Sequence, residues 1–181
     1  MRLLAPAAAL ALALLPTAAI PALPVGAQAP DFTTGGALAG RPFRLHLSEQ
    51  LRHGPVVLYF YPRSFTQGCT LEAHAFSEAA RDFRRAGARV IGMSADDYEL
   101  LRRFSVEACR NAFPVATASS DTIRAYDVRL RDGDPRTNRT SYVIAPDGRI
   151  LYAYSDLDYR NHVANTLAAV REWRAGQRRR R

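Results

Sequence analysis

Apolar and polar positions along the chain form blocks that predict alternating strands and helices. Val56 to Tyr61 is a continuous apolar and aromatic run between two prolines, which is typical of a strand buried on both faces. From Thr70 to Ala86 the apolar residues recur at helical spacing, and Gly87 ends the run, so we predict a helix there. Residues 88–93 again have the composition of a buried strand.

The second half of the chain continues this alternation. Asp96 is expected to cap a helix that runs to about Arg110, with Leu100, Leu101 and Phe104 facing inward. The later elements are expected at 115–116, at 120–126, in an antiparallel hairpin of strands 141–144 and 150–154 that turns through Pro-Asp-Gly, and in a helix over 159–173. This order predicts an α/β protein with a thioredoxin-like fold, in which helices flank a central mixed β-sheet.

The N-terminal segment has the organisation of a secretory signal. Met1 and Arg2 precede a run of leucine and alanine to Leu15, which is followed by small residues. We therefore predict a cleaved signal peptide at 1–19, one folded domain at 20–175 and a basic flexible tail at 176–181. The alternative for the first segment is an alanine-rich leader. A signal would make the mature protein periplasmic or secreted, with no membrane insertion after signal removal.

The net charge of +8 first suggests a nucleic-acid binder, because a basic surface attracts phosphate. All 25 basic residues are arginine, however, and they are spread along the whole chain. Arg2 and the run 178–181 carry five of these charges, so the rest of the chain has a net charge of only +3. We interpret the basic run as a solvated terminus and predict no nucleic-acid partner.

The two cysteines exclude a disulfide-dense small protein and a four-cysteine zinc module. Cys69 lies where the strand at 56–61 gives way to the following helix, and unpaired N–H groups at a helix start favour a thiolate. A free cysteine at such a junction can equally be a small buried apolar residue. Position alone leaves these two interpretations open.

The spacing of Pro62, Thr66 and Cys69 matches P-x-x-x-T-x-x-C, the active-site motif of the peroxiredoxins. Residues 25–32 resemble the opening Val-Gly-x-x-Ala-Pro-Asp-Phe of that family, and Gly-Cys-Thr-Leu-Glu-Ala at 68–73 resembles its bacterioferritin-comigratory, or Q-type, branch. The run 139–144 is similar to the strand that supplies the family's active-site arginine. The resemblance extends from Val25 to about Trp173.

This resemblance implies a thiol-dependent peroxidase in which Cys69 is the peroxidatic cysteine. It further implies that Thr66 positions the peroxide, that Pro62 shields the pocket and that Arg139 holds both the thiolate and the peroxide. Taken singly, each of the three has a simpler interpretation. Thr66 could cap the helix, Pro62 could end the strand, and Arg139 could be one more surface arginine.

The sequence departs from the Q-type pattern at one position. Many members carry a resolving cysteine five residues after the peroxidatic one, and His74 stands there in this chain. The other thiol is Cys109, which we expect to be resolving, with a bystander thiol as the alternative. On an extended helix it would lie about 80° outside the apolar arc, a poor place for a core residue. Glu72 is interpreted as a solvated carboxylate on an exposed helix face, with pairing to an arginine near the site as the alternative.

The expected partners are a hydroperoxide substrate and a thiol reductant, either a thioredoxin-like protein or a small thiol. The four histidines show no ligand spacing with the cysteines, so we predict no metal, and no cofactor is expected. The chain is expected to be a monomer or a dimer. A non-catalytic redox sensor and a thioredoxin-like thiol–disulfide exchange protein remain as alternatives, although exchange proteins use a C-x-x-C pair that Cys69 lacks.

Overall fold

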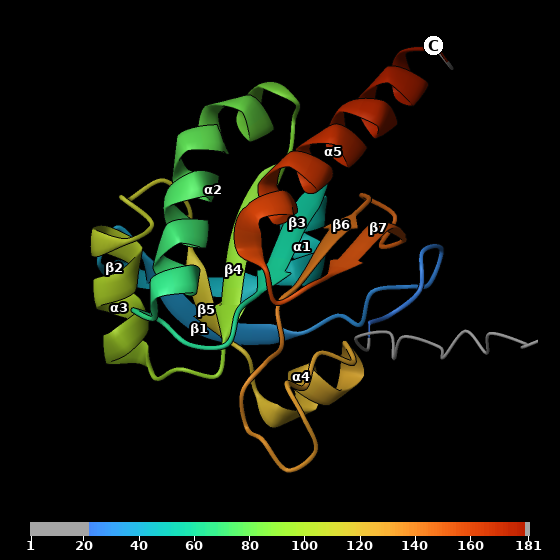
Figure 1. The fold of residues 1–181 in the computed structure, drawn as a ribbon. Coiled ribbons are helices and arrows are strands. Elements are labelled where there is room, and N and C mark those ends of the chain that lie inside the picture. The colour runs from blue at the N-terminus through green and yellow to red at the C-terminus, as the bar shows by residue number, and fades with distance from the viewer. Residues whose placement is uncertain (1–21, 180–181) are drawn as a thin grey trace, which may run out of the picture.

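The computed structural model describes residues 22–179 (Figure 1). The predicted signal peptide at 1–19 lies outside the described residues. The elements in chain order are β1 (Thr33–Leu38), β2 (Arg41–His46), α1 (Leu47–Leu51), β3 (Val56–Phe60), α2 (Gln67–Arg85), β4 (Arg89–Ser94), α3 (Tyr98–Glu107), β5 (Val115–Thr117), α4 (Ser120–Ala125), β6 (Thr140–Ile144), β7 (Ile150–Ser155), a 3₁₀ turn (Tyr159–Asn161) and α5 (His162–Arg179).

A single mixed sheet organises these elements, with the strand order β2-β1-β5-β4-β3-β6-β7. β3 pairs in parallel with β4, and β4 pairs in parallel with β5, whereas β6 runs antiparallel to β3. The hairpins β1–β2 and β6–β7 form the two edges. The predicted α/β architecture with a mixed sheet is confirmed.

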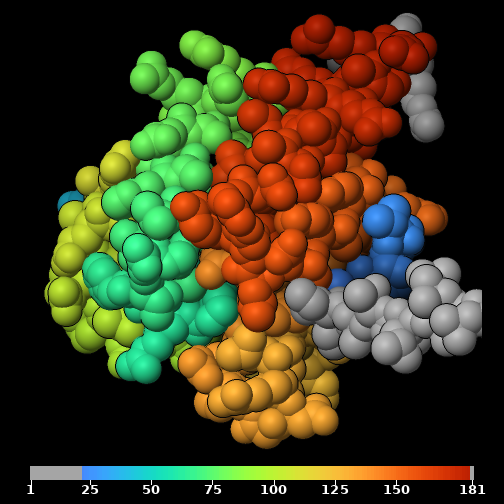
Figure 2. All heavy atoms as spheres, in the orientation of Figure 1, coloured from blue at the N-terminus to red at the C-terminus, as the bar shows by residue number. Residues whose placement is uncertain are grey.

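The strand β3 shows why its sequence is continuously apolar. Val57 and Tyr59 face a core shared with α2, α3 and α5, whereas Leu58 and Phe60 face a second core on the side of α1 and α4. Helices therefore cover both faces of the sheet, so every residue of β3 is buried. In the space-filling view, α2 (green) and α5 (red) lie against each other on one side of the molecule (Figure 2).

Several element boundaries differ from the prediction. α2 begins at Gln67, and α3 is capped by the side chain of Asp97, which accepts a hydrogen bond from Leu100 N. Asp96, the predicted cap, instead accepts hydrogen bonds from Ser64 N and Ser94 Oγ. α5 extends to Arg179, beyond its expected end at 173.

The hairpin β1–β2 and the short helix α1 were not anticipated. The run Thr-Thr-Gly-Gly-Ala-Leu of β1 has no alternation of apolar and polar residues, so its pattern gives no strand signal. The structure explains one of its glycines. A Cβ at Gly36 would lie 2.1 Å from the carbonyl oxygen of Val115 on β5, so only glycine permits this strand pairing.

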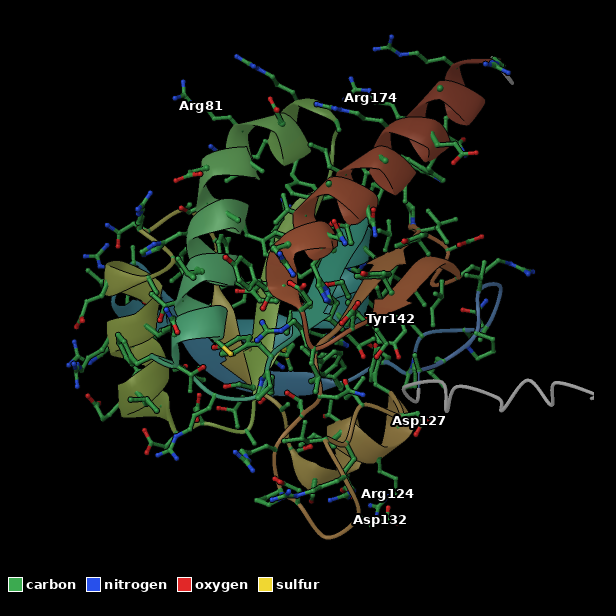
Figure 3. All side chains as sticks on the ribbon, in the orientation of Figure 1. Arg81, Arg124, Asp127, Asp132, Tyr142 and Arg174 are labelled. Atoms are coloured by element: carbon green, nitrogen blue, oxygen red, sulfur yellow. The ribbon has the colours of Figure 1, made fainter. Side chains whose placement is uncertain are left out.

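The described arginines other than Arg139 are exposed or half-buried. Arg81 and Arg174 project outward at the end of the molecule formed by the C-terminal halves of α2 and α5 (Figure 3). Arg171 joins these two helices through Asp82, with an N–O distance of 3.5 Å. No helix in the described part of the chain combines the length and apolarity that a bilayer span requires.

Candidate active site

The turn between β3 and α2 places Cys69 at the start of a long helix. Tyr61 extends β3 by one hydrogen bond from its N–H to the carbonyl of Met93, after which residues 62–66 form the connection. Phe65 in this connection has a φ of 63°, so the chain reverses there in the left-handed region. Cys69 is the third residue of α2 and is 2% exposed. Its sulfur is therefore near the positive end of the helix dipole and shielded from bulk water.

The pairing of β6 with β3 brings Arg139 to Cys69. Thr140 is the register partner of Phe60, so Arg139 lies at the same end of the sheet as the start of α2. Its Nη2 donates to Cys69 Sγ at 3.4 Å, and its Nε donates to the carbonyl of Leu157 at 2.9 Å. Arg139 is buried, which excludes the interpretation that it is one more surface arginine.

Thr66 and Pro62 flank the same connection. The hydroxyl of Thr66 donates to the carbonyl of Arg63 at 3.0 Å and makes no side-chain cap to α2, although Thr66 occupies the N-cap position. The Thr66 side chain is exposed, and Pro62 is half-buried immediately after β3. The structure thus places both residues in the segment that leads into Cys69.

Glu72 corrects the prediction of a solvated carboxylate. It lies three residues after Cys69 on α2, is 0% exposed and forms a buried ion pair with Arg139 Nη1. Arg139 is therefore a single cation that contacts both Cys69 and Glu72. Burial raises the pKa of Glu72 to about 8, against the opposing effect of the Arg139 guanidinium.

His162 is a member of this cluster that sequence reasoning missed. It is the first residue of α5 and is 0% exposed. Its Nε2 contacts the carbonyl of Asp156 at 2.9 Å, and its Nδ1 contacts Ser141 Oγ at 2.8 Å. Nδ1 also lies 3.8 Å from Glu72 Oε1. Burial lowers the pKa of His162 to about 4.

Cys109 is not on the helix surface, which corrects the expectation that it makes a poor core residue. α3 ends at Glu107, so the helical projection no longer holds at position 109. The chain turns inward there, and Cys109 is 0% exposed in the same core cluster as Cys69 and Tyr59. Both thiols are free. Burial also raises the pKa of the Cys109 thiol far above its usual range.

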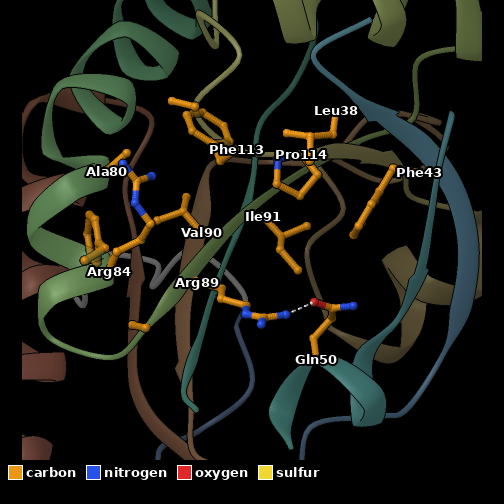
Figure 4. Close-up of a pocket in the computed structure, with 13 residues that line it drawn as sticks. Leu38, Phe43, Gln50, Ala80, Arg84, Arg89, Val90, Ile91, Phe113 and Pro114 are labelled. Atoms are coloured by element: carbon orange, nitrogen blue, oxygen red, sulfur yellow. Dashed lines mark hydrogen bonds between the residues drawn. The ribbon is translucent and has the colours of Figure 1, made fainter. Parts of the chain in front are cut away.

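The apolar pocket shown in Figure 4 is separate from this cluster. Phe83 and Arg84 near the end of α2, Val90 at the start of β4, and Phe113 line it. Cys69 lies at the opposite end of α2, and none of the residues proposed from the sequence contributes to the pocket. Within residues 22–179, no group of three or more His, Cys, Asp or Glu side chains is arranged to hold a metal.

Comparisons with known proteins identify the family of this chain. The model of the AhpC/TSA family matches residues 25–153, and the chain belongs to that family. A Mycobacterium tuberculosis protein named as a peroxiredoxin is 34% identical over 141 residues, which cover 76% of this chain and 90% of the relative. Peroxiredoxin Q of Oryza sativa subsp. japonica is 31% identical over 144 residues, covering 78% of this chain and 64% of that protein.

Solved structures give the same result. The crystal structure of peroxidoxin BcpB from Mycobacterium tuberculosis superposes with a TM-score of 0.72 at 31% identity, covering 82% of this chain and 96% of that one. The reduced 2-Cys peroxiredoxin of Plasmodium vivax, at 20% identity and a TM-score of 0.75, shares the fold. The chain is thus a peroxiredoxin, a thiol-dependent peroxidase that uses hydroperoxides and a thiol reductant.

The pKa values of Glu72 and His162 predict how stability depends on pH. Folded Glu72 keeps its proton up to about pH 8, whereas an ordinary carboxyl loses it near 4.5, so its contribution to stability falls as pH rises between these values. The lowered pKa of His162 has the opposite effect between about 4 and 6.5. Above pH 6.5 the contribution of His162 is constant, and we expect the fall caused by Glu72 to reach about 2 kcal/mol by pH 8. The raised pKa of the half-buried His46, caused by its hydrogen bonds to Glu49 and Asp31, also lowers stability as pH rises.

Urea unfolding at pH 6.5 and pH 8.5 measures this fall. Glu72→Gln should lose it, because its side chain does not titrate. Glu78→Gln changes an exposed carboxylate on the same helix and should keep it. An equal pH dependence in Glu72→Gln and the parent protein would show that Glu72 titrates in its ordinary range.

Proposed function

We propose that Cys69 is the nucleophile of this peroxidase. Its thiolate attacks one oxygen of the hydroperoxide, the O–O bond breaks, and the products are a sulfenic acid on Cys69 and an alcohol or water. The observation that carries this proposal is the 3.4 Å contact between Arg139 Nη2 and Cys69 Sγ at the N-terminus of α2. A fixed cation and a helix N-terminus both stabilise the thiolate there.

The neighbouring residues suit supporting roles in this reaction. Arg139 is held by Leu157 and Glu72, so its guanidinium is already oriented before the substrate arrives. Thr66 offers a hydroxyl in the connection that leads into α2, where it can donate to the peroxide after leaving the Arg63 carbonyl. Pro62 presents ring surface without an N–H group that would compete for the peroxide.

Turnover of hydrogen peroxide with a dithiol reductant tests the proposal. Full-length mature protein should consume peroxide catalytically with dithiothreitol, and the consumption should stop when Cys69 is alkylated beforehand. Stoichiometric oxidation without turnover would instead favour a redox sensor on the same fold.

For the second step, Cys109 or an external thiol condenses with the sulfenic acid and releases water. Burial of Cys109 means that the end of α3 must open before a disulfide forms. The backbone after this cysteine favours such opening, because Arg110 has a positive φ of 50°, which is strained for a residue with a long side chain.

Non-reducing peptide mapping after one equivalent of peroxide distinguishes the two routes. We expect a Cys69–Cys109 cross-link, accompanied by faster amide hydrogen exchange around 66–73 and 104–111, because both segments must loosen. Cys109→Ser provides the control, in which the cross-link and the increased exchange should be absent. Oxidised Cys69 beside a free Cys109 in the parent protein would show that the resolving thiol is external.

The setting of this chemistry is part of the proposal. The leader at 1–19 suits export, so the mature enzyme would act in the periplasm or outside the cell, as a monomer or dimer. Its reductant there would be an exported thioredoxin-like protein or a small thiol. The Q-type and Bcp names of the relatives support the branch assignment made from residues 68–73.

Expression in a two-membrane bacterial host tests export. The mature protein should begin near Ile20 and appear in the periplasmic or extracellular fraction. Leu12→Arg places a charge in the apolar run and should leave the protein unprocessed in the cytoplasm. An intact Met1 terminus on parent protein in the cytoplasmic fraction would exclude a signal peptide.

A further inference from the structure

The cluster behind Cys69 contains an unusual polar atom. Glu72 Oε1 is buried and accepts no hydrogen bond from any residue that the structure describes. A buried carboxylate oxygen without a donor is costly, because it has lost its water and gained nothing in return. His162 Nδ1 lies 3.8 Å from this oxygen.

The hydrogen bonds of His162 show which nitrogen is free to accept a proton. The carbonyl of Asp156 can only accept, so Nε2 carries the ring proton and donates it there. Nδ1 is then unprotonated and accepts from the hydroxyl of Ser141. Two proton acceptors, Nδ1 and Glu72 Oε1, therefore face each other across 3.8 Å with no proton assigned between them.

The sum of the charges in the cluster also indicates that it binds one additional proton. The titratable and charged groups around Glu72 and His162 are Cys69 on α2, Tyr59 on β3, Arg139 before β6, Tyr154 on β7, and Asp156 and Asp158 before α5. Arg139 is the cation among them. If Cys69 is a thiolate and Glu72 a carboxylate, the two buried anions share this one cation and the cluster carries a net charge of −1. One additional proton makes it neutral.

We propose that Glu72 and His162 together hold this proton while Cys69 is a thiolate, and that they release it when Cys69 is oxidised. Formation of the thiolate then moves a proton within the cluster. The S–H bond of Cys69 is lost, and an O–H bond on Glu72 or an N–H bond on His162 is gained. The buried charge stays at zero in both forms, which avoids the cost of an unpaired buried ion. The raised pKa of Glu72 agrees with a proton held at neutral pH.

The same proton accounts for the leaving group in the reaction with peroxide. Thiolate attack on hydrogen peroxide forms the S–O bond, leaves one hydrogen on the sulfenic acid and expels hydroxide. The proton of the pair converts this hydroxide to water, so no net proton is drawn from solution. Once the sulfur is neutral, a retained proton would leave Arg139 uncompensated, and the pair therefore gives it up. This inference rests on the proposed role of Cys69.

Proton uptake during oxidation tests the inference. The experiment uses the Cys109→Ser background, in which the reaction stops at the sulfenic acid. The pH is chosen so that the thiolate absorbance has reached its maximum. Stopped-flow mixing with hydrogen peroxide in weak buffer with a pH indicator reports the protons taken up per sulfenic acid. Adding Glu72→Gln should raise the uptake by about one proton, because the amide cannot hold the proton. The difference in proton uptake between the two proteins should vanish above about pH 8, where Glu72 and His162 hold no extra proton.

Glu78→Gln on the same background is the matched control and should leave the uptake unchanged, since Glu78 is exposed and pairs with Arg110. Equal uptake with and without Glu72→Gln at neutral pH would overturn the proposal. Mass spectrometry of the same samples separates this result from a failure of the proposed function. If the proposed function is wrong, Cys69 does not gain the oxygen mass of about 16 Da.

Difference infrared spectroscopy provides a second readout that keeps Glu72 in place. Oxidation of Cys69 in the Cys109→Ser protein should remove either the carbonyl stretch of a protonated carboxylic acid or the ring band of an imidazolium. Loss of one of these bands supports a proton held on Glu72 or His162. Oxidation without any change in either band would contradict it.

Discussion

Cys69→Ser should reduce the peroxidase rate by at least about 10³-fold, because a serine hydroxyl is not ionised at neutral pH and cannot replace the thiolate as nucleophile. The substitution changes one buried atom, so the fold should persist. Cys109→Ser is the matched control, since it alters the other buried thiol of the same core. It should retain the first, peroxide-consuming step and lose only the intramolecular disulfide.

Stopped-flow mixing with hydrogen peroxide under single-turnover conditions measures this step directly. Circular dichroism of both variants establishes that they are folded. Peroxide consumption by Cys69→Ser at the parent rate would assign the chemistry to another residue and end the proposed function.

Arg139→Met should slow the reaction with peroxide by about 10² to 10³-fold, as expected when a preorganised donor next to the reacting atoms is removed. The substitution also removes the guanidinium that contacts Cys69 Sγ. The same substitution should lower the free energy of unfolding by about 1 to 3 kcal/mol, because it leaves the buried Glu72 carboxyl without its hydrogen-bond donor.

The double variant Arg139→Met with Glu72→Gln separates the two effects. It removes the unpaired carboxyl and should recover part of the lost stability, whereas the slow reaction should remain. Urea unfolding and single-turnover rates on the same preparations measure both quantities. An unchanged rate in Arg139→Met would show that its contact with Cys69 contributes nothing to the chemistry.

The central part of the fold could be predicted because its patterns are local. The uniformly apolar β3, the helical spacing of α2 and the Pro-Asp-Gly turn between β6 and β7 each depend on neighbouring residues. β1 could not be predicted, because its own residues show no strand pattern and Gly36 is explained only by its close approach to β5. The start of α2 was predicted at Thr70, three residues after its actual start at Gln67. Thr66 occupies the N-cap position but makes no side-chain hydrogen bond to the helix.

Glu72 shows why the candidate site was only partly predictable. The sequence predicts Glu72 in solvent, whereas the structure buries Glu72 and leaves the neighbouring apolar Leu71 41% exposed. The reason is Arg139, which lies 67 residues further along the chain, immediately before β6, and pairs with Glu72 inside the protein. His162 was missed because its role depends on the meeting of α2, β6 and α5, and a single histidine gives no sequence signal.

The most direct measurement of the central claim is the mass of the protein after one equivalent of hydrogen peroxide, with dimedone present to trap sulfenic acid and peptide mapping to locate the label. On the Cys109→Ser background we predict a single dimedone adduct on the peptide that contains Cys69, formed as fast as peroxide is consumed. Consumption of peroxide with Cys69 unlabelled and still a free thiol would contradict the account.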